Sequence, residues 1–124
     1  MSYTVEDFLR KRDELAGLFN ECTDLLIALG DENRQKIVTK MMYAESSRMR
    51  VVEIAESSEL SRPAVSHHMQ ILKNAGLVKS EKKGTTIYYR LAGDSESLQK
   101  FYDLAVTMHD ICSACASLSC KKTS

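Results

Sequence analysis

The sequence predicts a mainly helical fold with one small β-hairpin. Apolar residues recur at helical spacing near both ends of the chain, a pattern typical of amphipathic helices. Two extended stretches, 77–81 and 85–91, are joined through Lys82, Lys83 and Gly84. The second stretch is rich in β-branched and aromatic residues, which favours two strands connected by a turn.

Length and composition indicate one compact domain. The chain has 124 residues, of which 44% are hydrophobic and 27% are charged, a balance suited to a single core. We expect one domain over residues 1–120 and a disordered tail at 121–124. No apolar run reaches the roughly 18 residues that span a bilayer, and the first ten residues lack the layout of a signal peptide. The sequence therefore predicts a cytoplasmic protein that has no membrane partner.

The first part of the chain is expected to hold two helices. Thr4 followed by Asp7 resembles a helix-opening cap, and an apolar stripe continues from there over residues 8–29. Asp31 can cap the next helix, which is expected to end at 46–47. The buried face of this second helix is predicted to consist of Ile37, Val38, Met41 and Met42.

Two short helices are predicted in the middle of the chain, directly before the hairpin. A brief helix begins near Val52 and ends at the polar turn 57–60. Ser61 then caps another helix, in which Pro63 fits the first turn and Gly76 ends the last one. Two helices joined by a tight turn and followed by a hairpin form a winged helix-turn-helix, whose second helix enters the major groove of DNA.

The helix after Ser61 has two contrasting faces. Val65, Met69 and Leu72 fall on one side, where they can pack into a core. The other side offers short and medium polar groups that reach base edges, with basic residues at its margins for phosphates. His68 lies toward the buried edge, so we expect it to be a structural histidine. The predicted DNA-contacting residues of this helix are Arg62, Pro63, Ser66, His67, Gln70, Lys73 and Asn74.

Positive charge is concentrated around this helix and the hairpin. Residues 61–92 contain six basic residues and one acidic residue, whereas the whole chain has a formal net charge of zero. Lys82 and Lys83 at the hairpin can lie along the neighbouring backbone or minor groove. A solvated surface can carry such charge as well, and the same fold could serve as a protein-interaction module. The combination of basic hairpin and polar helix face favours double-stranded operator DNA as the partner.

A long final helix is predicted after the hairpin. Asp94 or Ser95 can cap it, and its apolar stripe holds for about five turns. We expect the first and last helices to pack within the chain and also to form a homodimer interface, because a single winged unit reads only a short half-site. The stripe consists of Leu98, Phe101, Tyr102, Ala105, Met108, Cys112 and Cys115.

Residues 25–91 resemble the ArsR family of small bacterial repressors, also called the ArsR/SmtB or arsenic-repressor-like family. The resemblance implies a winged-helix homodimer that represses its operator. It also implies release of the operator when an inducer binds, often a metal or metalloid ion. The matching segments are Leu26-Ile-Ala-Leu-Gly-Asp31 with Arg34 and Ile37, Val52-Glu-Ile-Ala55, Leu60-Ser-Arg-Pro-Ala-Val-Ser-His-His-Met69, Leu72-Lys-Asn-Ala-Gly-Leu-Val78 and Gly84-Thr-Thr-Ile-Tyr-Tyr-Arg-Leu91.

Two metal-site patterns of that family are incomplete in this sequence. Members that sense metal beside the recognition helix carry a Cys-x-Cys pair, where this chain has Arg50-Val-Val52. Members that sense zinc on the final helix use an Asp and a His near its start and further ligands about three turns later. The residues at those places are Asp94 and Glu96 for the first half, and Thr107, Asp110 and the out-of-step His109 for the second.

The cysteines suggest a different inducer site. Cys112 and Cys115 are three residues apart on the predicted final helix, so both thiols project from one face. If the terminal helices pack together, Cys22 can converge with this pair, and Cys120 can reach in from the next turn and a half. Thiolates bind soft or borderline ions, so the predicted ligand is arsenite, Cd(II), Zn(II) or Cu(I).

Other roles for the cysteines stay open at this point. Cys22 alone can simply fill a core, and the pair Cys112 and Cys115 can oxidise reversibly in a redox-responsive regulator. A regulator that responds to no ligand is a further alternative. As an enzyme, the chain would be a thiol-disulfide oxidoreductase, but such pairs sit at the start of a helix and this one lies near an end. With neither a phosphate-binding glycine loop nor an HExxH motif, we expect no enzyme.

Overall fold

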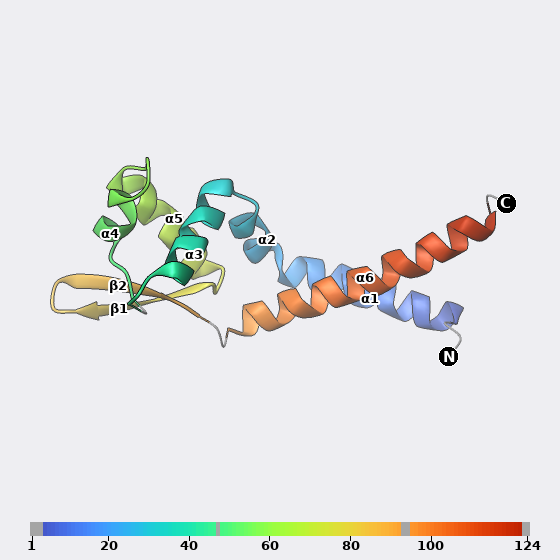
Figure 1. Cartoon of the computed structure of the whole chain (residues 1–124). Coiled ribbons are helices and arrows are strands. Elements are labelled where there is room, and N and C mark those ends of the chain that lie inside the picture. The colour runs from blue at the N-terminus through green and yellow to red at the C-terminus, as the bar shows by residue number, and fades with distance from the viewer. Residues whose placement is uncertain (1–3, 47, 93–94, 123–124) are drawn as a thin grey trace. The chain divides into compact units, whose positions relative to one another are not determined.

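The computed structural model describes residues 4–46, 48–92 and 95–122, with side chains described as far as residue 117. As predicted, the described chain is mainly helical with a two-stranded antiparallel sheet (Figure 1). Contacts group it into two compact units. Residues 24–98 form one, called the winged unit below, and the remaining residues at both ends form the other, called the terminal unit. None of the described helices is both long and apolar enough to cross a membrane. In chain order the elements are α1 (Val5–Glu21), α2 (Thr23–Leu29), α3 (Glu32–Tyr43), α4 (Val51–Glu56), α5 (Arg62–Asn74), β1 (Val78–Lys83), β2 (Thr86–Leu91) and α6 (Glu96–Lys122).

The first predicted helix is divided into α1 and α2. Its predicted start is confirmed, because Thr4 and Asp7 form a capping box in which each side chain accepts a hydrogen bond from the other's amide. The division at Cys22 corrects the prediction of one continuous helix. The hydroxyl of Thr23 donates to the Phe19 carbonyl at 2.9 Å, and such back-bonding by a threonine bends helices.

In the terminal unit, α1 and the greater part of α6 lie side by side (Figure 1). Lys11 Nζ on α1 lies 2.7 Å from Asp110 Oδ2 on α6. At the other end of α1, Cys22 interacts electrostatically with Lys100 and Asp103 of α6. The two helices therefore run antiparallel.

The apolar stripe predicted for α6 is only partly covered within one chain, with Leu98, Phe101 and Met108 half-buried and the rest of the stripe exposed. Tyr102 is 65% exposed, and Cys112 and Cys115 are exposed as well. Leu104, outside that stripe, is 2% exposed. A single neighbouring helix covers only a narrow strip of another helix, so most of a wide stripe is left uncovered. The helix itself continues to Lys122, two residues into the segment for which the sequence predicts a disordered tail.

In the winged unit, α3 begins at the predicted cap Asp31, whose carboxylate accepts a hydrogen bond from an amide of the first turn. Its predicted buried face is partly wrong. Ile37 and Met41 are buried, at 3% and 8% exposed, but Val38 is half-buried and Met42 is 67% exposed. Adjacent residues point about 100° apart on a helix, so burial of Met41 turns Met42 toward solvent.

The core of the winged unit lies where the helices meet the sheet. β2 contacts α3 and α4, and β1 contacts α5. Met49 and Tyr89 exchange two backbone hydrogen bonds of 2.8 Å, which tie the segment between α3 and α4 to the sheet. The most deeply buried side chains of this unit are Leu25, Ala28, Ile54, Val65, Met69, Leu72, Val78 and Ala92.

The hairpin is tighter than the sequence predicts. Lys83 pairs with Thr86, so the turn consists of Gly84 and Thr85 alone. Gly84 has φ +63°, the sign that a type II′ turn requires at its first central position. Lys82 and Lys83 therefore belong to β1, which corrects their placement in a connecting loop.

Candidate nucleic-acid interface

Both ends of α5 are fixed by local hydrogen bonds. At its start, Ser61 Oγ accepts from the Ala64 amide at 3.2 Å, and the proline falls in the first turn as predicted. At its end, the Leu77 amide donates to the Leu72 carbonyl and the Gly76 amide to the Lys73 carbonyl, both at 3.0 Å. These two bonds with a left-handed glycine form a Schellman motif. Both boundaries of the helix are therefore fixed by hydrogen bonds within residues 61–77.

The two faces of α5 separate as the sequence predicts. Val65, Met69 and Leu72 are each 0% exposed and anchor the helix in the core. Gln70 Nε2 donates to Asn74 Oδ1 at 2.9 Å, which orients both amides along the outer face. This face consists entirely of exposed residues, namely Arg62, Pro63, Ser66, His67, Gln70, Lys73 and Asn74.

The hairpin adds positive charge next to α5, which β1 contacts. Lys82 and Lys83 are exposed, as a nucleic-acid contact would require. Alternation along the strands places Lys79, Glu81 and Lys83 on one face, together with their partners Arg90, Tyr88 and Thr86.

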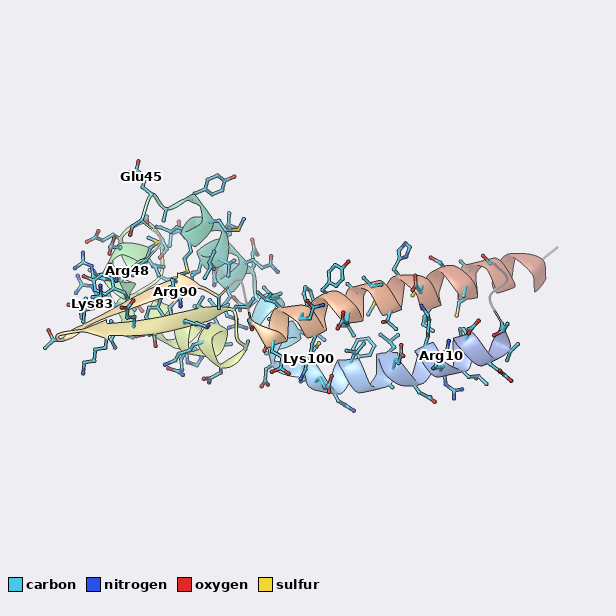
Figure 2. All side chains as sticks on the ribbon, turned by 90° about the horizontal axis from the view of Figure 1, so that it is seen from below. Arg10, Glu45, Arg48, Lys83, Arg90 and Lys100 are labelled. Carbon is cyan, nitrogen blue, oxygen red and sulfur yellow. The ribbon has the colours of Figure 1, made fainter. Side chains whose placement is uncertain are left out.

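Arg48 joins this face of the hairpin from the segment before α4. Its guanidinium carbon lies 5.2 Å from the centre of the Tyr88 ring, and its Nη1 lies 3.4 Å from the Glu81 carboxylate. The same carboxylate lies 4.0 Å from Lys83 Nζ. Figure 2 shows Arg48, Lys83 and Arg90 at the hairpin. Sequence reasoning counted Arg90 only as charge and missed Arg48, whose place depends on the backbone bridge to β2.

His68 occupies a structural position, in agreement with the sequence. It is half-buried, and its Nδ1 lies 3.2 Å from an Nη atom of Arg34. Arg34 is only 8% exposed and also donates to the carbonyls of Ala28 and Ile27, at 2.8 and 3.1 Å. The burial of this arginine could not be read from the sequence, because its partners are backbone oxygens of another helix.

The cysteines separate into a buried thiol and an exposed pair. Cys22 is 2% exposed, and burial raises the pKa of its thiol. Cys112 and Cys115 are both exposed on α6, and the side chain of Cys120 lies outside those described. Among the described side chains, no three His, Cys, Asp or Glu residues lie close enough together to hold a metal ion. Within one chain, the predicted convergence of Cys22 with the pair is therefore not found.

The alternative zinc positions on α6 are likewise not assembled within the described part of one chain. Asp110 is paired with Lys11, and the strong hydrogen bond lowers the pKa of this carboxyl group. His109 is 80% exposed with its Nδ1 at 3.8 Å from Asp110. Asp94 lies outside the described residues. Nothing in this geometry favours a zinc site over the exposed thiol pair.

A helix-turn-helix with a polar second helix and a basic hairpin defines a winged helix-turn-helix regulator that binds DNA. The family model of bacterial regulatory proteins of the arsR family matches residues 31–80. An uncharacterized HTH-type transcriptional regulator of Methanocaldococcus jannaschii is 34% identical over 76 residues, which cover 61% of this chain and 83% of that protein. The chain belongs to the arsR family.

Two further relatives carry more specific names. The transcriptional repressor SdpR of Bacillus subtilis is 38% identical over 64 residues, covering 52% of this chain and 68% of SdpR. A homologue of the cadmium resistance regulatory protein CadC from Staphylococcus aureus is 33% identical over 78 residues, covering 63% of this chain and 61% of the homologue.

Solved structures agree with the fold. An ArsR-like transcriptional regulator from Rhodococcus sp. RHA1 aligns with a TM-score of 0.67 and 28% identity, covering 87% of this chain and 93% of that one. The homodimeric winged helix-turn-helix domain of Mb0332 from Mycobacterium bovis aligns with a TM-score of 0.57 and 25% identity, covering 77% and 86%. These matching proteins are transcriptional regulators and not enzymes.

Proposed function

We propose that this protein is a homodimeric, sequence-specific repressor that binds double-stranded operator DNA in the cytoplasm. The observation that carries the proposal is the outer face of α5, which is exposed along its whole length and polar except at Pro63, while Val65, Met69 and Leu72 on the opposite face are fully buried. A helix held in this way can enter the major groove without disturbing the core. The relationship to the repressor SdpR supports the assignment of repression.

The residues of the interface have different roles in this proposal. Ser66, Gln70 and Asn74 have hydrogen-bonding groups suited to base edges, and a glutamine or asparagine suits adenine in particular. Pro63 and His67 lie on the same exposed face. The basic side chains Arg62, Lys73, Lys82 and Lys83 would bind phosphates and set the register of the helix.

The terminal unit supplies the surface for dimerisation. Apolar side chains stay exposed on both of its helices, among them Phe19 at 41%, Tyr102 at 65% and Val106 at 44%. Isolated apolar residues are common on surfaces, but these three occur on two helices that pack together. The homodimeric relative from Mycobacterium bovis supports a second copy of this chain as the partner.

The inducer we propose is a thiophilic metal or metalloid ion, namely arsenite, Cd(II), Zn(II) or Cu(I). Cys112 and Cys115 are exposed and three residues apart on α6, so two thiolates can bind one ion from the same face. Three or four ligands are needed for a closed site. The others would come from Cys120 or from the partner subunit. The relationship to a CadC homologue supports this class of ligand.

The test is a titration of the reduced, metal-free protein on DNA from its own promoter. Arsenite, Cd(II), Zn(II), Cu(I) and an oxidant are then added in separate samples. We expect a shift that weakens with salt, because phosphate contacts release counterions. One thiophilic ion should release the DNA. Release by the oxidant alone would favour the redox-responsive alternative. If this protein bound another protein but gave no salt-dependent shift of the DNA, the interaction module would be favoured.

Matched variants connect release to the cysteines. In the double variant Cys112→Ser, Cys115→Ser, operator binding should be intact and the ion should no longer release the DNA. Ser113 is exposed and lies between the two cysteines. Ser113→Ala therefore serves as the control and should respond to the ion like the wild type. Normal induction in the double variant would refute the cysteine site and leave the repressor proposal standing.

A further inference from the structure

A buried arginine connects three helices of the winged unit. Arg34 on α3 is 8% exposed. Its Nε donates to the Ala28 carbonyl at 2.8 Å and one Nη donates to the Ile27 carbonyl at 3.1 Å, at the end of α2. Its other Nη lies 3.2 Å from Nδ1 of His68, in the middle of α5. One guanidinium therefore links the recognition helix to the carboxyl end of α2.

The chemistry of this contact requires one particular form of the histidine. A guanidinium has only N–H donors and stays protonated, so Nδ1 of His68 must accept the hydrogen bond. A neutral imidazole with an acceptor at Nδ1 carries its proton on Nε2. If Nδ1 is protonated as well, an N–H faces an N–H and two positive charges lie 3.2 Å apart. The bond is then lost.

Other charged groups act on the same contact. The Asp31 carboxylate caps α3 and interacts electrostatically with both Arg34 and His68. On α5 itself, the ring of His67 lies 6.1 Å from that of His68. Asp31 attracts a protonated His68, while Arg34 and a protonated His67 repel it. Among these groups, Arg34 alone is in hydrogen-bond contact with the ring.

We infer that His68 is a positioning residue for the recognition helix and that its neutral form is required for full DNA affinity. The inference rests on the proposed function of α5 as the DNA-reading helix. The other anchors of α5, Val65, Met69 and Leu72, are apolar, and apolar contacts are not directional. A hydrogen bond has a preferred direction, so the bond to Arg34 restrains the rotation of α5. Protonation of His68 removes that restraint.

The first test compares substitutions of His68 in the full-length protein on promoter DNA. In His68→Asn the amide oxygen can take the place of Nδ1 as acceptor, and the side chain does not titrate. We expect its affinity at pH 8 to lie within about twofold of wild type, and His68→Leu to bind about tenfold more weakly. Rescue by asparagine but not leucine separates a lost acceptor from a merely altered volume.

The pH profile is the decisive comparison. Between pH 8 and 5.5 we expect wild-type affinity to fall about tenfold relative to His68→Asn. Both proteins contain His67, so any gain in DNA affinity from its protonation cancels in the ratio of the two affinities. His109→Asn, on α6 and far more exposed, should follow the wild-type profile. Identical pH profiles for wild type and His68→Asn would overturn the inference.

A measurement without DNA keeps the two proposals distinguishable. Nitrogen-15 spectra of the imidazole rings should show His68 at pH 8 with its proton on Nε2 and Nδ1 unprotonated. On acidification, the amide signals of α5 should shift together with the ring of His68 in wild type and not in His68→Asn. A proton on Nδ1 at pH 8 would refute the inference. Failure of every variant to bind DNA at any pH would instead refute the proposed function.

Discussion

Lys11 Nζ and Asp110 Oδ2 lie 2.7 Å apart although 99 residues separate them in the sequence. This ion pair joins α1 to α6. The hydrogen bond from Lys11 lowers the pKa of Asp110, and the Coulomb attraction of the same lysine adds to it. The folded state therefore favours the charged form of Asp110 more strongly than the unfolded state does.

The first prediction concerns the acid sensitivity of this pair. Its contribution to the free energy of unfolding is fully present above the ordinary carboxylate pKa and is lost as the pH falls through the lowered value. Asp110→Asn should therefore be less stable than wild type at neutral pH, and the difference should shrink toward acid pH. Urea midpoints from pH 7 to 3 measure it, with Asp13→Asn, 75% exposed beside Arg12, as the control. A difference that is constant with pH would contradict this assignment.

The second prediction concerns Gly76 at the end of α5. Its φ is +83°, and a Cβ atom there would lie 2.6 Å from Ser97 Oγ and 2.8 Å from Ser95 Oγ. Gly76→Ala should lower the free energy of unfolding by about 2–4 kcal/mol, from backbone strain and from this clash. Gly84 also has a positive φ, but a Cβ atom there would meet no atom within 4 Å. We therefore expect Gly84→Ala to lower the free energy of unfolding by only about 1 kcal/mol. Equal losses in urea denaturation would show that the approach of Ser97 has no effect.

The third prediction concerns phosphate contacts. Lys73 is exposed on the proposed DNA face of α5. Lys73→Ala should weaken binding to all DNA sequences alike and should reduce the slope of log affinity against log salt by about 1. Lys36→Ala, on α3 with 71% of its side chain exposed, is the matched control and should not change the slope. If the two variants behave alike, Lys73 does not contact phosphate.

The fourth prediction concerns thiol reactivity. Burial raises the pKa of Cys22, so little of it is thiolate at neutral pH and reagents reach it poorly. Iodoacetamide should modify Cys112 and Cys115 at least about tenfold faster than Cys22 in the folded protein. Mass spectrometry of peptides after timed labelling measures these rates. In urea the rates should converge, and a Cys22 that reacts as fast as the pair before unfolding would contradict its burial.

Local signals in the sequence were sufficient for most helix boundaries. The caps at Thr4, Asp31 and Ser61 each act within three residues, so neighbouring residues alone determine them. Gly76 marks the end of α5 for the same reason, since its left-handed conformation is a local requirement. The two faces of α5 follow from its periodicity, and they are the part of the candidate interface that the sequence predicts best.

Features that depend on distant partners could not be predicted in this way. The stripe through Cys22 continues at helical spacing, so the division between α1 and α2 has no glycine or proline to mark it. Arg34 is charged, and its burial depends on carbonyl groups of α2. Arg48 reaches the hairpin only because Met49 pairs with Tyr89. In each case the deciding contact lies outside the local pattern.

The bridge between Met49 and Tyr89 has a consequence for how such regulators can diverge. It consists of two hydrogen bonds between main-chain atoms, and these make no demand on the side chains at neighbouring positions, of which Arg48 and Tyr88 are half-buried and Arg90 is exposed. Arg48, Tyr88 and Arg90 can therefore be exchanged without detaching the strand from the helices. Substitutions at these positions can therefore change the charge of the hairpin while the scaffold stays the same, so a change in the proposed DNA preference would need no new fold.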